Sequence, residues 1–308
     1  MDDKLGLPYW AIGTALALGS TLLIGDPYIV SVVNLISIAA LTAVSLRFVM
    51  LIGELNFATA AFVGIGAYTA GAAVTILDWP FLVAILLAGV VAAAVSALFG
   101  FVTLKTKGPY FLLISFAFTE AVRIVYSKSM FLGGNSGMVG IFPPLALDPW
   151  MPTFIMAVSA ALIFALYAAE RSDFGKILIA IRDNENVART VGLNILLIKV
   201  ACFALASFAA GIAGSLHAFA NSVISPGDFS YLLAAFALAY VKVGGEDSIL
   251  GPIIGAVLLV SLGSYALGLG GQEHIFYGAA IVLVVLLMPH GLVGLVRRGR
   301  DKLAQRRA

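Results

Sequence analysis

The sequence predicts an all-α polytopic membrane protein with about ten transmembrane helices. Three observations support this: the composition, the length of the apolar runs and the distribution of basic residues. Of the 308 residues, 61% are hydrophobic and only 11% are charged, whereas a soluble domain carries about 25% charged residues. The mean hydropathy of +1.06 agrees with this composition. This small number of polar side chains cannot cover the surface of a water-soluble protein. Lipid must therefore surround most of the chain.

Ten apolar runs are candidates for membrane spans. A hydrocarbon core of about 30 Å takes roughly 20 helical residues to cross, and helices satisfy their own backbone hydrogen bonds in lipid. The runs are Pro8–Ile24, Tyr28–Leu46, Phe57–Leu77, Phe81–Leu104, Pro109–Tyr126, Pro152–Ala169, Val200–Ala220, Tyr231–Val243, Leu250–Leu269 and His274–Val296. The eighth is short, and we expect it to be tilted, broken or extended. The boundary between the second and third is soft and leaves room for a re-entrant segment within Arg47–Ala73.

The basic residues give an orientation. If both termini are cytoplasmic, every one of the 18 basic residues falls on the cytoplasmic side except Lys128, which is outside, and Arg123, which lies within a span. Cytoplasmic loops of membrane proteins carry such an excess of Lys and Arg. We therefore expect a single transmembrane domain over residues 1–308, with cytoplasmic termini and a basic cytoplasmic tail at 297–308.

The largest cytoplasmic loop, residues 171–198, has an apolar face. Ile177, Ile181, Ala188 and Val191 recur at helical spacing and can share one side. The pattern predicts two short helices at the membrane surface, with a turn near Gly192 after the first. One interpretation is a solvated loop whose charges fix the topology. The other is a coupling helix that docks on a motor subunit, with Arg182 and Glu185 as exposed charges.

Chemistry-bearing groups are few. Cys202 is the single cysteine, and the three histidines lie far apart in the sequence. No disulfide or thiolate metal cluster can form within the chain. We expect no cofactor, no metal, no catalytic residues and no nucleic-acid partner.

The loop carries the most specific motif. It reads Gly175, Leu178, Ala180-Ile181-Arg182-Asp183-Asn184-Glu185, Ala188 and Gly192-Leu193-Asn194. This run resembles the cytoplasmic loop of permeases from ABC importers of branched-chain amino acids, which read G-x-x-L-x-A-I-R-D-N-E-x-A-A-x-x-x-G-I-N at this place.

Other stretches resemble the same family in the same order, over about residues 30–296, and the closest subgroup is the M-type permease subunit. They are Gly64–Ala70 (G-I-G-A-Y-T-A), Gly108–Phe111 with Phe118–Arg123, the Gly133–Gly137 loop, Gly244-Gly245 with Gly251–Ala256, and Pro289-His290-Gly291-Leu292.

The resemblance implies an ABC-importer permease fold in a bacterial-type inner membrane. It implies a subunit that forms half of the pathway for branched-chain amino acids or a related small polar solute. The implied partners are the lipid bilayer, a second homologous permease, two cytoplasmic ATP-binding subunits and an extracytoplasmic solute-binding protein. The chain has no G-x-x-x-x-G-K-[ST] motif, so ATP hydrolysis would belong to separate subunits. The residues implied in coupling are Gly175, Arg182, Asp183, Asn184, Glu185, Ala188 and Gly192.

The pathway candidates are Glu54, Asn56, Thr59, Tyr68, Glu120 and Arg123. The family usually reads G-Q-x-S-x-G-H-A-A-F where this chain reads Gly53–Phe62, so Glu54 replaces Gln, Asn56 replaces Ser and Thr59 replaces His. If this stretch lines the pathway, the solute differs from leucine, isoleucine and valine; otherwise Glu54 and Asn56 form an interfacial cap. Glu120 and Arg123 are three residues apart and can pair, either as a structural pair with Arg123 reaching the outer surface or as a polar lining.

Two other function classes remain to be weighed. A self-sufficient secondary transporter or channel would need its own selectivity residues, often with inverted repeats and broken helices near the midplane, and no convincing repeat is present. An intramembrane enzyme would need paired carboxylates, a His/Cys cluster or a nucleophile–base set within the spans. The discriminating observation is whether the purified chain transports alone.

Overall fold

The computed structural model describes residues 26–268 and residue 278. The predicted first and tenth spans and the basic tail lie outside these residues. Within the described part, eight apolar helices correspond one to one to the second through ninth predicted spans. They are α2 (Pro27–Met50), α3 (Thr59–Thr75), α4 (Phe81–Thr103), α5 (Pro109–Lys128), α6 (Met151–Arg171), α9 (Ile195–Asn221), α10 (Tyr231–Gly244) and α11 (Leu250–Gly268).

Five of these helices are long and apolar enough to cross a membrane: α2, α4, α5, α6 with the residues just before it, and α9. The helices α3 and α10 are apolar but shorter, and so is the part of α11 from Leu250 to Tyr265. The third span, expected at Phe57–Leu77, is two residues shorter at each end, and the boundary before it is a non-helical segment between Leu51 and Ala58. The described chain is a multi-pass helical bundle.

The 27-residue helix α9 forms the centre of the bundle and packs against α2, α3, α4 and α6. Small residues bring its backbone close to its neighbours. A Cβ atom on Gly66 of α3 would lie 2.0 Å from the Gly211 carbonyl oxygen of α9. Another on Gly214 of α9 would lie 1.8 Å from the Val63 carbonyl oxygen. Such close approach is how membrane helices associate, since van der Waals contact replaces the missing hydrophobic driving force.

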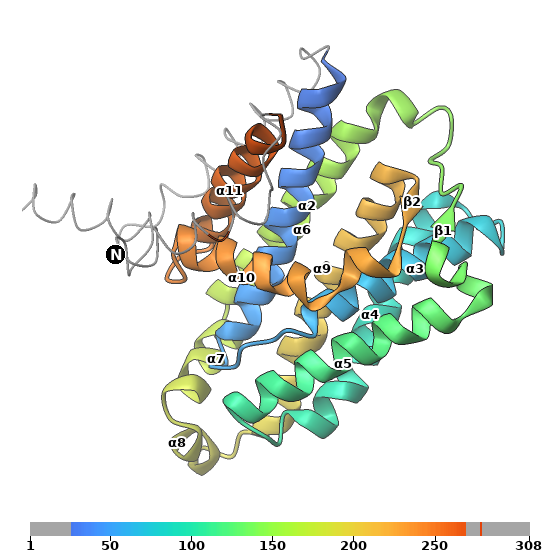
Figure 1. Ribbon diagram of the computed structural model, residues 1–308. Helices are drawn as coiled ribbons and strands as arrows, with labels where there is room; N and C mark the ends of the chain where they lie inside the picture. The colour runs from blue at the N-terminus through green and yellow to red at the C-terminus, as the bar shows by residue number, and fades with distance from the viewer. Residues whose placement is uncertain (1–25, 269–277, 279–308) are drawn as a thin grey trace, which may run out of the picture.

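A second group of helices packs on the other side of α2. Helices α10 and α11 contact each other and α2, and α6 also lies along α2 (Figure 1). A tight turn that contains glycine joins α10 to α11. A Cβ atom on Gly244 would lie 1.7 Å from the Gly251 carbonyl oxygen. The predicted eighth span is thus a short helix ended by a turn.

Short elements connect the helices at the end of the bundle opposite to α7 and α8. They are η1 (Met130–Leu132), η2 (Gly134–Ser136), η3 (Asp148–Trp150), η4 (Pro226–Phe229) and the two strands β1 (Met138–Val139) and β2 (Val223–Ile224). The strands pair antiparallel, with Met138 opposite Ile224 and Val139 opposite Val223. This pair ties the α5–α6 connection to the end of α9.

The predicted cytoplasmic loop forms α7 (Asp173–Asp183) and α8 (Glu185–Thr190), which project from one end of the bundle (Figure 1). The two short helices are confirmed, but the expected position of the turn is wrong. Asn184 separates α7 from α8, and its side chain accepts hydrogen bonds from the Asn186 and Val187 amides. Gly192, at φ +82°, instead ends α8 before α9 begins.

Candidate functional site

The segment between α2 and α3, Leu51–Ala58, is a break whose backbone is satisfied by polar side chains. The Phe57 amide donates to the Ser115 hydroxyl oxygen at 3.1 Å, and the Thr119 hydroxyl donates to the Phe57 carbonyl at 2.9 Å. Both side chains are buried on α5. Irregular backbone inside a membrane protein needs such internal partners. The polar residues of α5 therefore hold the α2–α3 segment against that helix.

Two predicted pathway residues, Asn56 and Thr59, close the α2–α3 segment from within. The Asn56 carboxamide oxygen accepts from the Ala58 amide at 3.0 Å, and its Nδ2 donates to the Thr59 hydroxyl at 3.2 Å. Both residues are buried. Asn56 and Thr59 therefore form a local turn at the start of α3, whose N-cap residue is Ala58.

Glu54 fixes the same segment to the turn before α5. Its carboxylate accepts a hydrogen bond of 2.9 Å from the Gly108 amide. Gly108 has φ +59° and ψ −128°, a conformation that L residues with a side chain rarely adopt. Burial raises the pKa of the Glu54 carboxyl above its ordinary value, against the opposing effects of the Gly108 hydrogen bond and the charges of Lys199 and Lys107.

Arg47 and Glu170 form a bidentate ion pair that the sequence did not predict. The Arg47 Nη1 and Nη2 atoms lie 2.7 and 2.9 Å from the two Glu170 carboxylate oxygens. The Arg47 Nε atom donates to the Glu246 carbonyl at 2.7 Å. The Arg47 side chain is only 3% exposed. The signal in the sequence was a charged residue in the last turn of an apolar run, which we assigned only to topology.

A polar cavity of about 340 Å³ opens beside this pair. Its walls come from the end of α2, the α2–α3 segment, α7 and the α10–α11 turn, and they include Arg47, Glu54, Glu170, Arg182 and Asp247. The stem of Arg182 packs on Gly53, where a Cβ atom would lie 3.1 Å from the arginine Cγ. Helix α7 thus contacts the α2–α3 segment directly.

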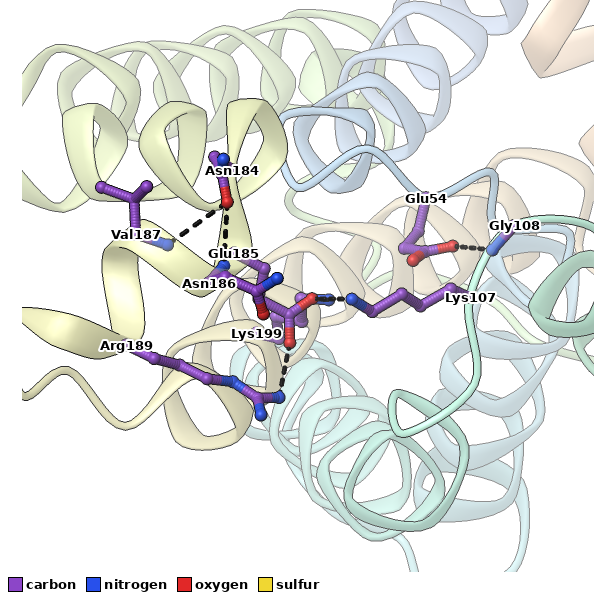
Figure 2. A network of polar contacts seen from close by, with 9 residues as sticks. All are labelled: Glu54, Lys107, Gly108, Asn184, Glu185, Asn186, Val187, Arg189 and Lys199. Atoms are coloured by element: carbon purple, nitrogen blue, oxygen red, sulfur yellow. Dashed lines mark hydrogen bonds and ion pairs between the residues drawn. The ribbon is translucent and has the colours of Figure 1, made fainter.

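Four charged residues at the α7–α8 end form what we call the ionic cluster: Lys107, Glu185, Arg189 and Lys199 (Figure 2). Glu185 is its centre, paired with Lys107, with Arg189 at 2.8 Å and with Lys199 at 3.3 Å. The carboxylate is 12% exposed, so the expectation of a free surface charge at Glu185 is wrong. Burial raises its pKa, but the hydrogen bonds from Lys107 and the two other cations outweigh burial and lower it to about 2.

Helices α7 and α8 bury one face and leave another open. Ile181, Ala188 and Ile195 form a small buried cluster against which Ile177 packs. Gly175 is also buried, and a Cβ atom there would lie 1.8 Å from the Glu170 carbonyl oxygen. Val191 does not share the buried face as predicted; it is 76% exposed. It lies just past the end of α8, at a C-cap that points its side chain away from the cluster.

The open face of α7 and α8 carries an apolar groove of about 510 Å³. Its walls include Ile177, Ala180, Val187, Val191 and Leu193, with Lys176, Asp183 and Asn184 at the edge. Val187 is 58% exposed. Arg182, Asp183, Asn184 and Gly192 are likewise on the surface.

The remaining pathway candidates lie elsewhere. The Arg123 Nε atom is 2.7 Å from a Glu120 oxygen, so the predicted pair forms, and both side chains are partly exposed. Glu120 also accepts from the Tyr231 amide at the start of α10, at 3.4 Å. Tyr68 is buried and stacks on Tyr126 with ring centroids 4.1 Å apart, and among the described residues neither hydroxyl has a hydrogen-bond partner. Glu54, Asn56 and Thr59 therefore come together, whereas Glu120 with Arg123, and Tyr68, form separate groups.

Within the described residues, no three His, Cys, Asp or Glu side chains lie close enough together to hold a metal ion.

Comparison with known proteins gives one family and several relatives. Residues 28–288 match the family model described as "Branched-chain amino acid transport system / permease component". The chain is 28% identical over 266 residues to the high-affinity branched-chain amino acid transport system permease protein LivM of Salmonella typhimurium, covering 77% of this chain and 63% of the relative. The LivM protein of Escherichia coli gives the same identity and coverage. The chain thus spans less than two thirds of these two relatives.

A relative named for another solute is matched over more of its own length. The ribose import permease protein RbsC of Escherichia coli is 25% identical over 268 residues, which cover 82% of each chain. No solved structure matches the chain.

We expect the Arg47–Glu170 pair to be far more costly to break than to remove. Changing Arg47 or Glu170 alone to Met leaves a buried charge without its partner, which costs about 3–5 kcal/mol. The double change removes both charges and should cost clearly less than the sum of the two single changes. Thermal unfolding of the purified variants in detergent measures this. Additive losses would contradict the buried-pair interpretation, and the more exposed Glu120–Arg123 pair, changed in the same way, is the comparison.

We also expect the ionic cluster to give a pH-dependent stability. Since folding lowers the Glu185 pKa from 4.5 to about 2, its contribution is present above about pH 4.5 and is lost as the pH falls toward 2. The stability difference between the wild type and Glu185→Gln should therefore be constant from pH 7 to about 5 and shrink below that. Thermal unfolding between pH 3 and 7 tests this. The neighbouring, exposed Asp183→Asn is the control, and a difference that grows on acidification would refute the expectation.

Proposed function

We propose that this chain is a membrane-spanning subunit of an ATP-driven importer. The premise is that it belongs to the family of permease components of branched-chain amino acid transport systems. It forms half of the pathway for a branched-chain amino acid or a related small polar solute. The other half comes from a second homologous permease. The relatives' names support the class of transporter, while LivM and RbsC differ in the solute they are named for.

The observation that carries the proposal is the apolar groove on α7 and α8. Exposed apolar surface on a projecting, charged element marks a site for another protein. The groove lies within the stretch whose sequence most resembles the family loop, and the buried Ala188 of that stretch forms part of its wall. We propose that an ATP-binding subunit occupies this groove and that two such subunits hydrolyse ATP for the complex. An extracytoplasmic solute-binding protein delivers the solute to the opposite end.

The α2–α3 segment is the proposed moving part of the pathway. It breaks the helical run at a place where backbone groups are held by side-chain hydrogen bonds instead of helical ones. Irregular backbone of this kind is tolerated in a membrane protein where it is buried in protein or lines a water-filled cavity. Glu54, Asn56 and Thr59 are then proposed to line or position the passage, with Tyr68, Glu120 and Arg123 further along it.

The proposed topology has ten spans, with both termini in the cytoplasm of a cell with a bacterial-type inner membrane. The distribution of basic residues supports it. A phosphatase reporter, which is active only outside the cytoplasm, should be inactive when fused after Ala308 and active when inserted in the exposed loop after Leu145. The opposite activities would overturn the topology.

The docking proposal predicts that charges placed in the groove abolish assembly. Val187→Glu with Val191→Glu should remove copurification of the ATP-binding subunit from membranes in which the adjacent transporter genes are expressed together. The double variant should still insert, because neither side chain packs in the interior.

The matched control is Lys105→Glu, a charge change at the same end of the molecule but outside the groove. Retained copurification in the double variant would overturn the docking site. Solute uptake by the purified chain alone in vesicles would overturn the importer proposal and favour a self-sufficient transporter.

A further inference from the structure

The ionic cluster and the α2–α3 segment are joined through one peptide bond. The Lys107 side chain reaches Glu185, at the start of α8, and the next amide along the chain, that of Gly108, donates to Glu54 (Figure 2). The donating N–H belongs to the peptide group that joins Lys107 to Gly108. A peptide group is planar and rigid, so a displacement of the Lys107 Cα atom is carried to the hydrogen bond with Glu54.

The partners of Glu185 differ in how firmly they are held. Lys199 lies on the central helix α9 with its side chain 3% exposed, whereas Lys107 lies in the α4–α5 turn with its side chain 59% exposed. An exposed ion pair separates at little cost, while a buried charge cannot lose its partner cheaply. Arg189 lies on α8 and moves with Glu185. Of the two partners on other elements, Lys199 is buried and Lys107 is exposed, so the pair with Lys107 is the one that a movement of α8 releases first.

A second contact links the same two parts of the molecule. The stem of Arg182 on α7 rests on Gly53, at the start of the break, while Glu54 is the next residue along. Gly53 has φ +82°, so this position turns the chain as it leaves α2. The α2–α3 segment thus touches the α7–α8 unit on one side and the Lys107–Gly108 turn on the other.

We propose that Lys107 is a positioning residue that transmits the movement of α8 to the α2–α3 segment. In the state described here, the Glu185–Lys107 pair holds the Gly108 amide against Glu54 and keeps the segment in place. When the ATP-binding subunits displace α8, the pair opens and the segment is free to rearrange. The inference rests on the proposed function, which supplies the movement of α8. The contacts between Glu185, Lys107, Gly108 and Glu54 are independent of that function.

The experiment uses the full transporter in vesicles and measures two quantities, namely solute transported per ATP hydrolysed and the exposure of the α2–α3 segment. Exposure is the rate at which a membrane-impermeant maleimide labels Leu55→Cys in a Cys202→Ala background. The variants are Lys107→Met and Lys107→Arg. The matched control is Lys105→Met, which removes the same charge from the same turn, where Lys105 lies over the Phe101 ring.

With Lys107→Met, we expect the transport-to-ATP ratio to fall and the labelling rate to rise, each by about two- to five-fold, the range set by a partly exposed ion pair. Lys107→Arg should restore both values, and Lys105→Met should change neither. ATP hydrolysis and copurification should persist in all variants, which excludes a folding defect.

An unchanged ratio or an unchanged labelling rate in Lys107→Met would overturn the proposal, because Lys107 would then either not hold the segment or not couple it. Absence of ATP-driven transport in the unmodified transporter would instead overturn the proposed function. In that case the labelling rate, which needs no ATP, still decides whether Lys107 positions the segment.

Discussion

The Arg47–Glu170 pair is the constraint on which the α7–α8 end of the bundle depends. Arg47 joins the end of α2 to the end of α6 through two hydrogen bonds and to the α10–α11 turn through the Glu246 carbonyl. A buried guanidinium needs all of these partners, because an unpaired charge in a low-dielectric interior is very costly. Three helix ends are therefore held in one arrangement, and the start of α7, three residues after Glu170, is placed by it.

The packing of the bundle and the contacts at the α7–α8 end follow from different physics. Around α9, glycine and alanine let backbones approach until a single added methyl group would collide with a carbonyl oxygen. Such contacts are lost outright when helices separate, so this close packing resists separation of the helices. At the α7–α8 end, ion pairs and side-chain hydrogen bonds hold the α2–α3 segment, and these have alternative partners. The closely packed part positions the site, and the polar part is the one that we propose to rearrange.

The sequence predicted the helices well because apolar length and breakers are local properties. Eight described helices begin and end near the expected residues, and the amphipathic pattern of Ile177, Ile181 and Ala188 predicted a packed face. The errors concern where side chains meet. Gly192 was assigned the turn that Asn184 makes, because an Asn that caps the start of a new helix and a Gly that ends one can both separate two short helices. Glu185 was taken as exposed because its partners Lys107 and Lys199 lie on other elements, and no spacing rule connects them.

The position of Glu54 changes what its difference from the family pattern means. A glutamine at this place would also accept the Gly108 hydrogen bond through its carboxamide oxygen. What the glutamate adds is a negative charge, and that charge interacts with Lys199 and Lys107, the cations that also hold Glu185. Two carboxylates thus share two lysines across the junction between α8 and the α2–α3 segment. The replacement of Gln by Glu at residue 54 therefore affects how strongly the α2–α3 segment is held to the ionic cluster. This effect is at least as direct as any effect on the choice of solute.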